Sequence, residues 1–371
     1  MRQTVRLGRL AGVDIGVHWT VLVVVLLLAL GLSTNVLPIA APGFVTLAYV
    51  SWAFVVAVLF FACLLAHELA HVLVARRFGV KAKRVTLWLL GGVSELDSDP
   101  PTPKADLLVA GAGPLTSLVL GGIGTGAAFG AGALGLPRLV VVALSWLAGV
   151  NLIIGVFNLL PGAPLDGGRI LRAILWRFRG DRLKAGVAAD RAGAGLGLVL
   201  AGVGLVQILF TRELTGLWLV LLGWFLITAA NAESTATRLQ AALAGRRVRD
   251  VMSTEPVSGY AGQSVDSFVT GVIAHSRHHV FPVLGLDGRP VGLVGRTALL
   301  RLPEEARSAT SLGEVARSGG ELPVVGPDDP AEAAVRALNP MRPLVPVVDG
   351  AQLVGVVTAA DVAHAAELAP L

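Results

Sequence analysis

The sequence is poor in cysteine and in charged side chains, and each shortage excludes a class of protein. Cys63 is the only cysteine, which excludes an intramolecular disulfide framework and a zinc site built from thiolates. Charged residues make up 15% of the 371 residues, and hydrophobic residues make up 54%. A mean hydropathy of +0.73 is too high for a soluble globular protein. The composition therefore indicates a membrane protein.

The chain also lacks a long basic run with interleaved aromatic residues, although its formal net charge is +5. Its basic clusters instead flank long apolar segments, as Arg2, Arg6 and Arg9 do before the first of them. That arrangement is typical of loops on the cytoplasmic side of a membrane. It argues against nucleic acid as a partner.

Six apolar segments are long enough to cross a bilayer as helices. They cover about residues 15–32, 44–75, 106–131, 139–158, 192–210 and 214–230. Clusters of arginine and lysine precede the first segment and follow the second, fourth and sixth. This alternation predicts a polytopic α-helical membrane protein with both termini in the cytoplasm and the turn at 211–214 outside.

The second apolar segment contains the sequence H-E-x-x-H at His67, Glu68 and His71. Residues four apart lie on one face of a helix, so the two histidines are placed to hold one metal ion. Glu68 lies beside them and is placed to take a proton from metal-bound water. Packing or chance is the alternative interpretation of a histidine pair. Ionisable groups in a membrane span are costly, however, and favour a functional site.

A proline-marked stretch follows the fourth segment and ends in a carboxylate. Pro161 and Pro164 must open the helix, and Asp166 comes directly after them at the same cytoplasmic depth as the histidines. Asp166 is therefore a candidate third metal ligand. The alternative is that it caps a helix beginning at Gly167, and the two roles are compatible.

Residues 85–94 are apolar, β-prone at their start and interrupted by the pair Gly91 and Gly92. The stretch is too short to cross a membrane as a helix, so we predict a re-entrant β hairpin or strand. An exposed strand edge there would bind an extended peptide by strand addition. The alternative is a simple surface loop.

The chain changes character at about Arg247, where a soluble α/β pattern begins. Residues 280–294 are echoed by residues 345–357, and each copy reads as strand, D-G turn and strand, followed by a helix. Two similar units of this kind predict a pseudo-twofold pair. The four histidines of this region are interpreted as surface residues: His275, His278, His279 and His364.

Together, these features resemble the site-2 protease family of intramembrane zinc metalloproteases, peptidase family M50, over about residues 1–240. The resemblance rests on three motifs: His67-Glu68-x-x-His71, Gly111-Ala112-Gly113-Pro114 and Asn158-x-x-Pro161-x-x-Pro164-Leu165-Asp166-Gly167. The C-terminal repeat is similar to a tandem pair of CBS modules. The expected domains are a transmembrane protease domain (1–240), a first CBS module (241–306) and a second CBS module (307–371).

The resemblance implies one Zn²⁺ per chain, bound by His67, His71 and Asp166, with Glu68 as general base. Asn158 would stabilise the substrate carbonyl or the oxyanion. The strand that contains Gly91 and Gly92 would hold an unwound substrate helix.

The CBS resemblance implies an adenine nucleotide and a homodimer as partners of the pair. The second module has the Thr-x-x-Asp run of a nucleotide site at Thr358 and Asp361, whereas the first has Gly295 and Ala298 at the aligned positions. At most one competent half-site per chain is expected. The alternative is that Thr358 caps the following helix, with Asp361 in its first turn.

The expected function is therefore intramembrane cleavage of single-span proteins of the plasma membrane, such as anti-sigma factors or membrane-tethered transcription regulators. A CBS-regulated channel or transporter is the main alternative, with the histidines and Asp166 as pathway groups. An inactive scaffold is a third. Zinc content separates the protease from the channel, and a cleavage assay separates it from the scaffold.

Overall fold

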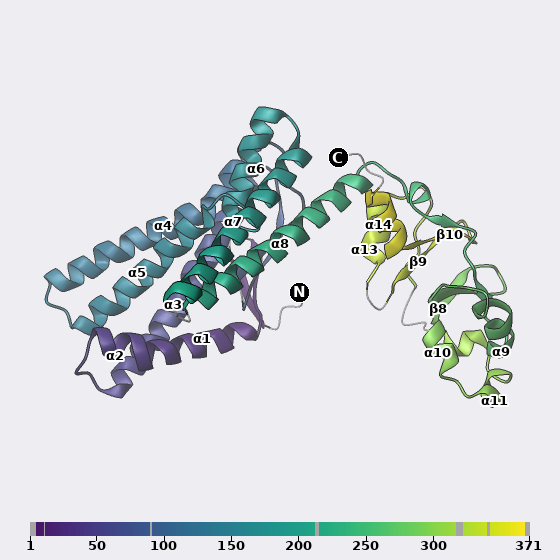
Figure 1. The fold of residues 1–371 in the computed structure, drawn as a ribbon, viewed down its shortest axis with the longest axis horizontal. Helices are drawn as coiled ribbons and strands as arrows, with labels where there is room; N and C mark the ends of the chain where they lie inside the picture. The colour runs from purple at the N-terminus through teal and green to yellow at the C-terminus, as the bar shows by residue number, and fades with distance from the viewer. Residues whose placement is uncertain are drawn as a thin grey trace. The chain divides into compact units, whose positions relative to one another are not determined.

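The structure is a computed structural model that describes residues 5–10, 12–89, 91–211, 215–316, 322–339 and 342–367. The chain divides into two compact units, Met1–Ser234 and Thr235–Leu371. Helices dominate the first unit, and the second mixes short helices with strands (Figure 1). Each unit is described by itself below.

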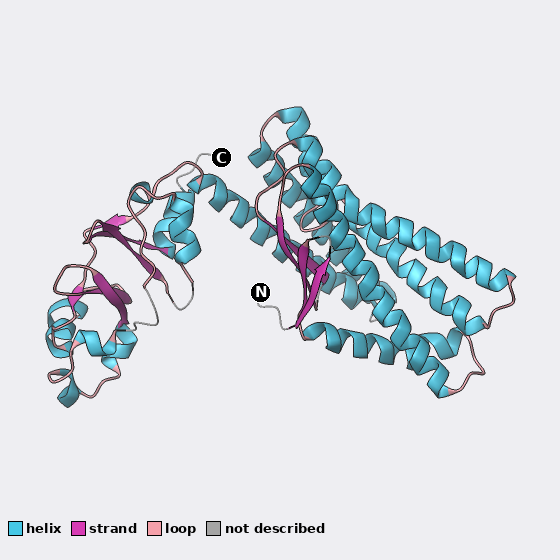
Figure 2. Ribbon diagram, turned by 180° about the vertical axis from the view of Figure 1, so that it is seen from behind, coloured by secondary structure: helices cyan, strands magenta, loops and turns pink. Residues whose placement is uncertain are grey.

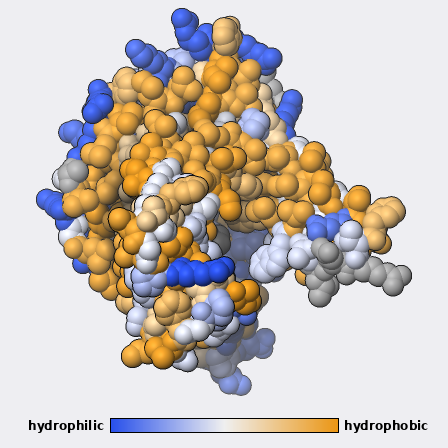
Figure 3. Space-filling model, turned by 90° about the vertical axis from the view of Figure 1, so that its left-hand side faces the viewer, coloured by the Kyte–Doolittle hydropathy of each residue, from blue (hydrophilic) through white to orange (hydrophobic). Residues whose placement is uncertain are grey.

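Within the described residues, six helices are long and apolar enough to cross a membrane. They are α1–α2 (Thr20–Ala40, including a π turn at Leu32–Val36), α3 (Thr46–Arg77), α4 (Pro103–Ala133), α5 (Arg138–Asn158), α7 (Arg182–Thr211) and α8 (Thr215–Leu243). Hydrophobic residues cover most of the face seen in Figure 3, as expected for helices that contact lipid. The prediction of a multi-pass membrane protein is confirmed.

Two of these helices extend well beyond the predicted apolar segments. Helix α7 begins at Arg182 and α8 ends at Leu243, because alanine, arginine and lysine continue a helix after the apolar stretch has ended. Hydropathy marks only the apolar part. The predicted outer turn covers residues 211–214: Thr211 is the last residue of α7, and residues 212–214 lie outside the described part of the chain.

A four-stranded sheet in the order β1-β2-β3-β4 packs beside the helices of the first unit (Figure 2). Its strands are β1 (Val5–Leu10), β2 (Val13–Val17), β3 (Ala82–Trp88) and β4 (Gly91–Leu96). The expectation that the first span begins near residue 15 is wrong, because β2 pairs in parallel with β3 and the helix begins at Thr20. Val13 and Ile15 are buried against Val72 and Val85.

Strands β3 and β4 form an antiparallel hairpin that pairs Val85 with Ser94 and Leu87 with Gly92. The alternative of a surface loop for residues 85–94 is therefore wrong. The hairpin belongs to the sheet described above and lies at its β4 edge. This edge matters because Gly92 and Ser94 both lie against the H-E-x-x-H helix.

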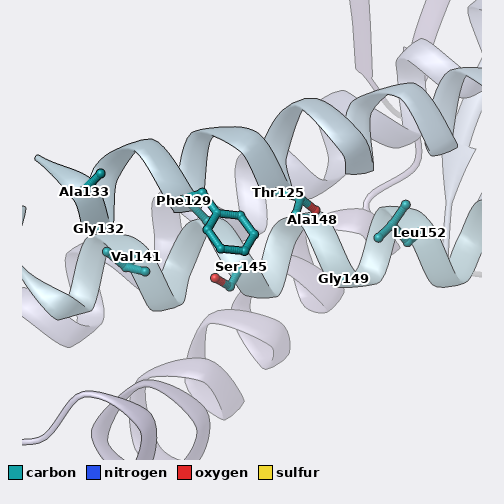
Figure 4. A pocket seen from close by; sticks show the side chains of 10 residues that line it. Thr125, Phe129, Gly132, Ala133, Val141, Ser145, Ala148, Gly149 and Leu152 are labelled. Atoms are coloured by element: carbon teal, nitrogen blue, oxygen red, sulfur yellow. The ribbon is translucent and has the colours of Figure 1, made fainter.

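Helices α4 and α5 pack closely through small residues. Gly121 lies against Leu152, and Gly155 lies against Leu118, so that the two helices approach where a larger side chain would clash. A pocket of about 560 Å³ lies along the same pair of helices and is lined by Thr125, Phe129 and Ser145, among others (Figure 4). The tight end leads to α6 (Asp166–Arg179).

The second unit contains two three-stranded sheets, in the orders β6-β7-β8 and β5-β10-β9. The strands are β5 (Ser253–Thr254), β6 (Gly259–Tyr260), β7 (Val280–Leu284), β8 (Pro290–Gly295), β9 (Leu344–Asp349) and β10 (Gln352–Thr358). The helices are α9 (Val265–Phe268), α10 (Arg296–Leu300), α11 (Glu304–Arg307), α12 (Leu312–Val315), α13 (Ala331–Ala337) and α14 (Ala359–Glu367). Two predicted D-G hairpins are confirmed, with Gly288 and Gly350 at φ of 77° and 61°. Each half has its own apolar core.

Candidate metal centre

His67 and His71 lie one turn apart on α3 and are both buried, with 4% and 6% of their surface exposed. Their ring centroids are 4.9 Å apart. Both histidines lie within one continuous α-helix, where residues four apart share a face. The side chains point away from lipid toward α4 and α6, as their hydrogen-bond partners show.

Asp166 opens helix α6 and completes a three-residue cluster. Its Oδ2 lies 3.3 Å from Nε2 of His67 and 3.3 Å from Nε2 of His71. The ligand atoms of the three residues all lie within 4.8 Å of one another. The alternative that Asp166 caps a helix beginning at Gly167 is wrong: the helix begins at Asp166 and its N-cap is Leu165. The carboxylate is instead turned toward the histidines.

Helix α4 holds both imidazole rings through their Nδ1 atoms. The Val109 carbonyl lies 2.7 Å from Nδ1 of His71, and because a carbonyl only accepts, that nitrogen donates. Nδ1 of His67 lies 2.9 Å from Oγ of Ser117. With Nδ1 engaged in this way, each ring presents Nε2 to the cluster, which is the arrangement that orients a metal-binding histidine.

Gly113 lies on the same helix, between these two partners. A Cβ atom added there would overlap Nε2 of both His67 and His71. Gly113 therefore leaves the space that a bound ion needs. Two imidazole nitrogens, one carboxylate oxygen and a glycine-lined gap fit zinc with an open fourth position, which is typical of a catalytic site.

Glu68 is half-buried and lies beside the cluster on α3. Ser94 of β4 donates a hydrogen bond of 2.9 Å to Oε2 of Glu68. A Cβ atom added at Gly92 would overlap the Glu68 side chain, so the strand backbone and the carboxylate are in close contact. The edge of the sheet and the candidate base therefore form one site.

The turn before α6 is folded tightly by glycines. A Cβ atom at Gly167 would overlap the carbonyl oxygen of Leu160, and one at Gly168 would overlap the backbone of Ala163. Gly193 of α7 packs against the same turn. The two glycines of the L-D-G-G sequence are thus required by backbone contacts, and they fix the point at which α6 begins.

A buried ion pair joins α4 to α6. Asp106 has no exposed surface, and its two carboxylate oxygens accept hydrogen bonds of 2.9 Å each from Nε and Nη2 of Arg172. Burial would lower the pKa of Arg172, but its hydrogen bonds to Asp106 raise that pKa above the ordinary value. The guanidinium is therefore charged.

Other predicted site residues are placed differently. Asn158 ends α5, and its Nδ2 donates a hydrogen bond of 3.1 Å to the carbonyl of Ile154 in its own helix. Gly91 begins β4 with φ of 139°. Thr358 and Asp361 bond to each other at the start of α14, as a cap does: Thr358 N donates to Oδ2 of Asp361 at 2.8 Å, and Asp361 N donates to Oγ1 of Thr358 at 3.3 Å.

Several contributors to this centre were missed by sequence reasoning. Ser94, Ser117, the Val109 carbonyl and the Asp106–Arg172 pair are not part of a local pattern. The motif at residues 111–114 drew attention to α4 without indicating what the helix does. In the structure, helix α4 supplies Gly113 beside the two histidines, and Val109 and Ser117 on either side of Gly113 bond to the two rings.

Comparison with known proteins shows the family of the chain. The model of peptidase family M50 matches residues 55–142 and 136–202, and the CBS domain model matches residues 248–305 and 312–367. Rip3 of Mycobacterium tuberculosis, a relative named for zinc metalloprotease activity, is 42% identical over 371 residues, covering 98% of this chain and 93% of the relative. A zinc metalloprotease of Methanocaldococcus jannaschii is 28% identical over 380 residues, covering 100% of this chain and 98% of the relative.

Among solved structures, the site-2 protease from Methanocaldococcus jannaschii is similar at 30% identity and a TM-score of 0.41, covering 62% of this chain and 94% of that one. The predicted zinc cofactor is confirmed by the metalloprotease relatives, and the channel alternative is disfavoured. The chain belongs to peptidase family M50 and is a zinc metalloprotease with two C-terminal CBS domains.

Proposed function

We propose that the chain is an intramembrane endopeptidase that cleaves the transmembrane segments of single-span membrane proteins, with His67, His71 and Asp166 as its zinc ligands. The observation that carries the proposal is the cluster itself. Three ligand atoms lie within 4.8 Å of one another among apolar helices, directly beside Glu68. Ionisable groups collected at such a depth are costly unless they perform chemistry.

When bound, zinc supplies a Lewis acid that polarises the scissile carbonyl and acidifies water. Glu68 is the general base that takes a proton from the attacking water and then delivers it to the leaving amine nitrogen. Ser94 orients the Glu68 carboxylate through the bond to Oε2. Ser117 and the Val109 carbonyl keep Nε2 of each histidine directed at the ion.

The substrate is presented as an extended strand along β4. Peptide bonds in a lipid-embedded helix are closed to attack by their own hydrogen bonds, so the substrate must unwind first. Among the described strands, β4 pairs only with β3 and lies at the edge of its sheet, which leaves its outer backbone groups for a partner strand. Gly92 keeps that edge narrow where it approaches Glu68, and Gly91 begins the same strand with a positive φ. Both glycines are proposed as part of the substrate-binding edge.

The protease lies in the plasma membrane with both termini and the CBS pair in the cytoplasm. Arg76 and Arg77 end α3 about two turns beyond the histidines, which supports a zinc site near the cytoplasmic face. Substrates of this kind include anti-sigma factors and membrane-tethered regulators, so the activity is regulated intramembrane proteolysis. Reporter fusions at Glu213 and Leu371 test the orientation, and a Leu371 fusion active only outside the cell would contradict it.

The CBS pair controls access by binding an adenine nucleotide in the second module and by forming a homodimer. A ligand changes cleavage only if it binds the open and closed arrangements of the membrane unit with different affinity. Thr358 and Asp361 are the residues proposed for the nucleotide. Oδ1 of Asp361 also accepts a hydrogen bond of 2.6 Å from Ser253, which a nucleotide would have to replace.

The direct test co-expresses the protein with single-span candidates and compares wild type with Glu68→Gln. Glu68→Gln is expected to keep zinc and fold, to lose at least ~10²-fold in cleavage rate, and to retain uncut substrate in a pulldown. Near-wild-type cleavage by Glu68→Gln would remove Glu68 from the mechanism. Zinc-loaded wild type that cleaves no transmembrane segment in a panel of single-span proteins would contradict the intramembrane activity.

A further inference from the structure

Asp106 and Arg172 form a buried ion pair in the first unit. The Asp106 side chain is fully buried and that of Arg172 is 17% exposed. The two hydrogen bonds of 2.9 Å are a bidentate contact between a planar guanidinium and a planar carboxylate. Arg169, one turn earlier on α6, lies 3.7 Å from the same carboxylate. Both arginines belong to the helix that Asp166 begins.

Asp106 also lies in line with the residues that hold the histidines. Asp106, Val109, Gly113 and Ser117 are separated by three, four and four positions, so they follow one face of α4. Three of them contact the imidazole rings or the space between their Nε2 atoms. The fourth, Asp106, contacts α6. One stripe of α4 is therefore in contact with all three proposed ligands, directly or through a neighbour.

Asp166 lies six residues before Arg172, which is a rise of about 9 Å along α6. The Asp166 side chain is short, so its position is set by where the first turn of α6 lies. The preceding turn fixes that end through Gly167 and Gly168. A second fixed point is needed to set the direction of the helix, and the bidentate contact at Arg172 provides one. A lysine in its place would keep the charge but not the fixed two-point geometry.

We propose that the Asp106–Arg172 pair is a positioning device that sets the third zinc ligand, Asp166, against His67 and His71. The inference rests on the proposed ligand set. Neither residue touches the reacting atoms; they act through α6. Loss of the two-point contact lets α6 turn or slide, and Asp166 then meets the ion at a different distance.

The test uses the full chain purified in detergent, with Arg172→Lys as the main variant because it keeps the buried positive charge. Asp106→Asn is the second variant. The matched control is Asp99→Asn, which breaks a more exposed pair of 2.9 Å between Asp99 and Arg182. Zinc affinity is measured by competition with a chromophoric chelator. The absorption spectrum of the cobalt-substituted protein reports ligand geometry, and circular dichroism with thermal unfolding reports the fold.

Arg172→Lys is expected to bind zinc about 10- to 100-fold more weakly and to show shifted cobalt bands, with helical content retained. Asp99→Asn is expected to match wild type in zinc affinity and in the cobalt spectrum. Zinc affinity within about threefold of wild type and an unchanged cobalt spectrum in Arg172→Lys would overturn the inference. An equal loss of zinc affinity in Asp99→Asn would also overturn the inference, because the loss would then follow from removing any nearby charge and not from the Asp106–Arg172 contact.

Asp166→Ala separates this inference from the ligand set on which it rests. If Asp166→Ala loses zinc while Arg172→Lys and Asp106→Asn bind normally, the ligand set stands and only the positioning proposal fails. If Asp166→Ala binds zinc as wild type does, the ligand set fails and the positioning proposal fails with it. If Asp106→Asn does not fold, Arg172→Lys alone decides.

Discussion

Ser94 of strand β4 donates a hydrogen bond of 2.9 Å to Oε2 of Glu68 on helix α3. The strand that we propose as the substrate-binding edge therefore also orients the general base. In that proposal, substrate pairing on β4 and proton transfer at Glu68 are linked, because a shift of the strand moves the hydroxyl that bonds to the carboxylate. A substrate that fails to pair in register leaves the base poorly aligned.

Ser94→Ala is accordingly expected to lower the turnover number about tenfold while zinc content stays at the wild-type level. The carboxylate keeps its charge but loses the bond that orients it. The measurement is cleavage of a reconstituted substrate with zinc analysis of the same sample. Ser94→Thr keeps a hydroxyl and is expected to recover most of the rate; a wild-type rate in Ser94→Ala would show that the bond does not matter.

Gly113→Ala is expected to weaken zinc binding about 10- to 100-fold, because its methyl group would overlap Nε2 of both histidines. Gly111→Ala is the matched control. It makes the same change half a turn earlier on α4, where an added Cβ meets no atom within 4 Å. Zinc affinity measured for both variants decides the matter. Equal affinities would mean that the ion does not occupy the space beside Gly113.

Asn158→Ala is expected to reduce the turnover number roughly 10²–10³-fold with little change in zinc affinity, if Asn158 supplies one oxyanion donor. Its Nδ2 donates to the Ile154 carbonyl in the present structure, so the amide must turn toward the substrate during the reaction. Single-turnover kinetics measure the chemical step directly. An Asn158→Ala enzyme as fast as wild type would discard the oxyanion function.

Nucleotide binding is expected to saturate at no more than one molecule per chain. Titration calorimetry of the full chain with ATP, ADP and AMP measures it. Thr358→Val is expected to abolish the heat, whereas Ser311→Val is the control, because Ser311 and Glu314 form the same kind of helix cap beside the β6-β7-β8 sheet, away from Thr358. Absence of heat with all three nucleotides at millimolar concentration would leave the pair as a dimerisation module.

Local patterns in the sequence predicted the parts of the centre that carry a fixed spacing. His67 and His71 lie on one face because a helix has a known period. Pro161 and Pro164 predicted that the helix opens into a turn before Asp166. The structure brings these three residues together. Their function as ligands stays a prediction that the zinc measurements test.

What sequence reasoning missed depends on contacts between distant segments. Val13, Ile15 and Val17 read as the start of the apolar segment that follows them, and the pairing of this strand with β3 is not visible in the local sequence. Asp106 and Arg172 are 66 residues apart, so neither indicates the other. Ser117 is one of many small residues in a glycine-rich helix, and nothing in the local sequence indicates its hydrogen bond to His67.

The donors of the metal centre are widely separated along the chain, with Asp166 arriving 99 residues after His67. During synthesis, α3 enters the membrane with both histidines and Glu68 long before α6 exists. At that stage α4 has its ring-holding residues available, but the donor set is incomplete. Under the proposed ligand set, a fragment that ends before Asp166 is therefore expected not to cleave its neighbours. On that proposal, the order of the elements along the chain delays the onset of proteolysis until α6 has been made.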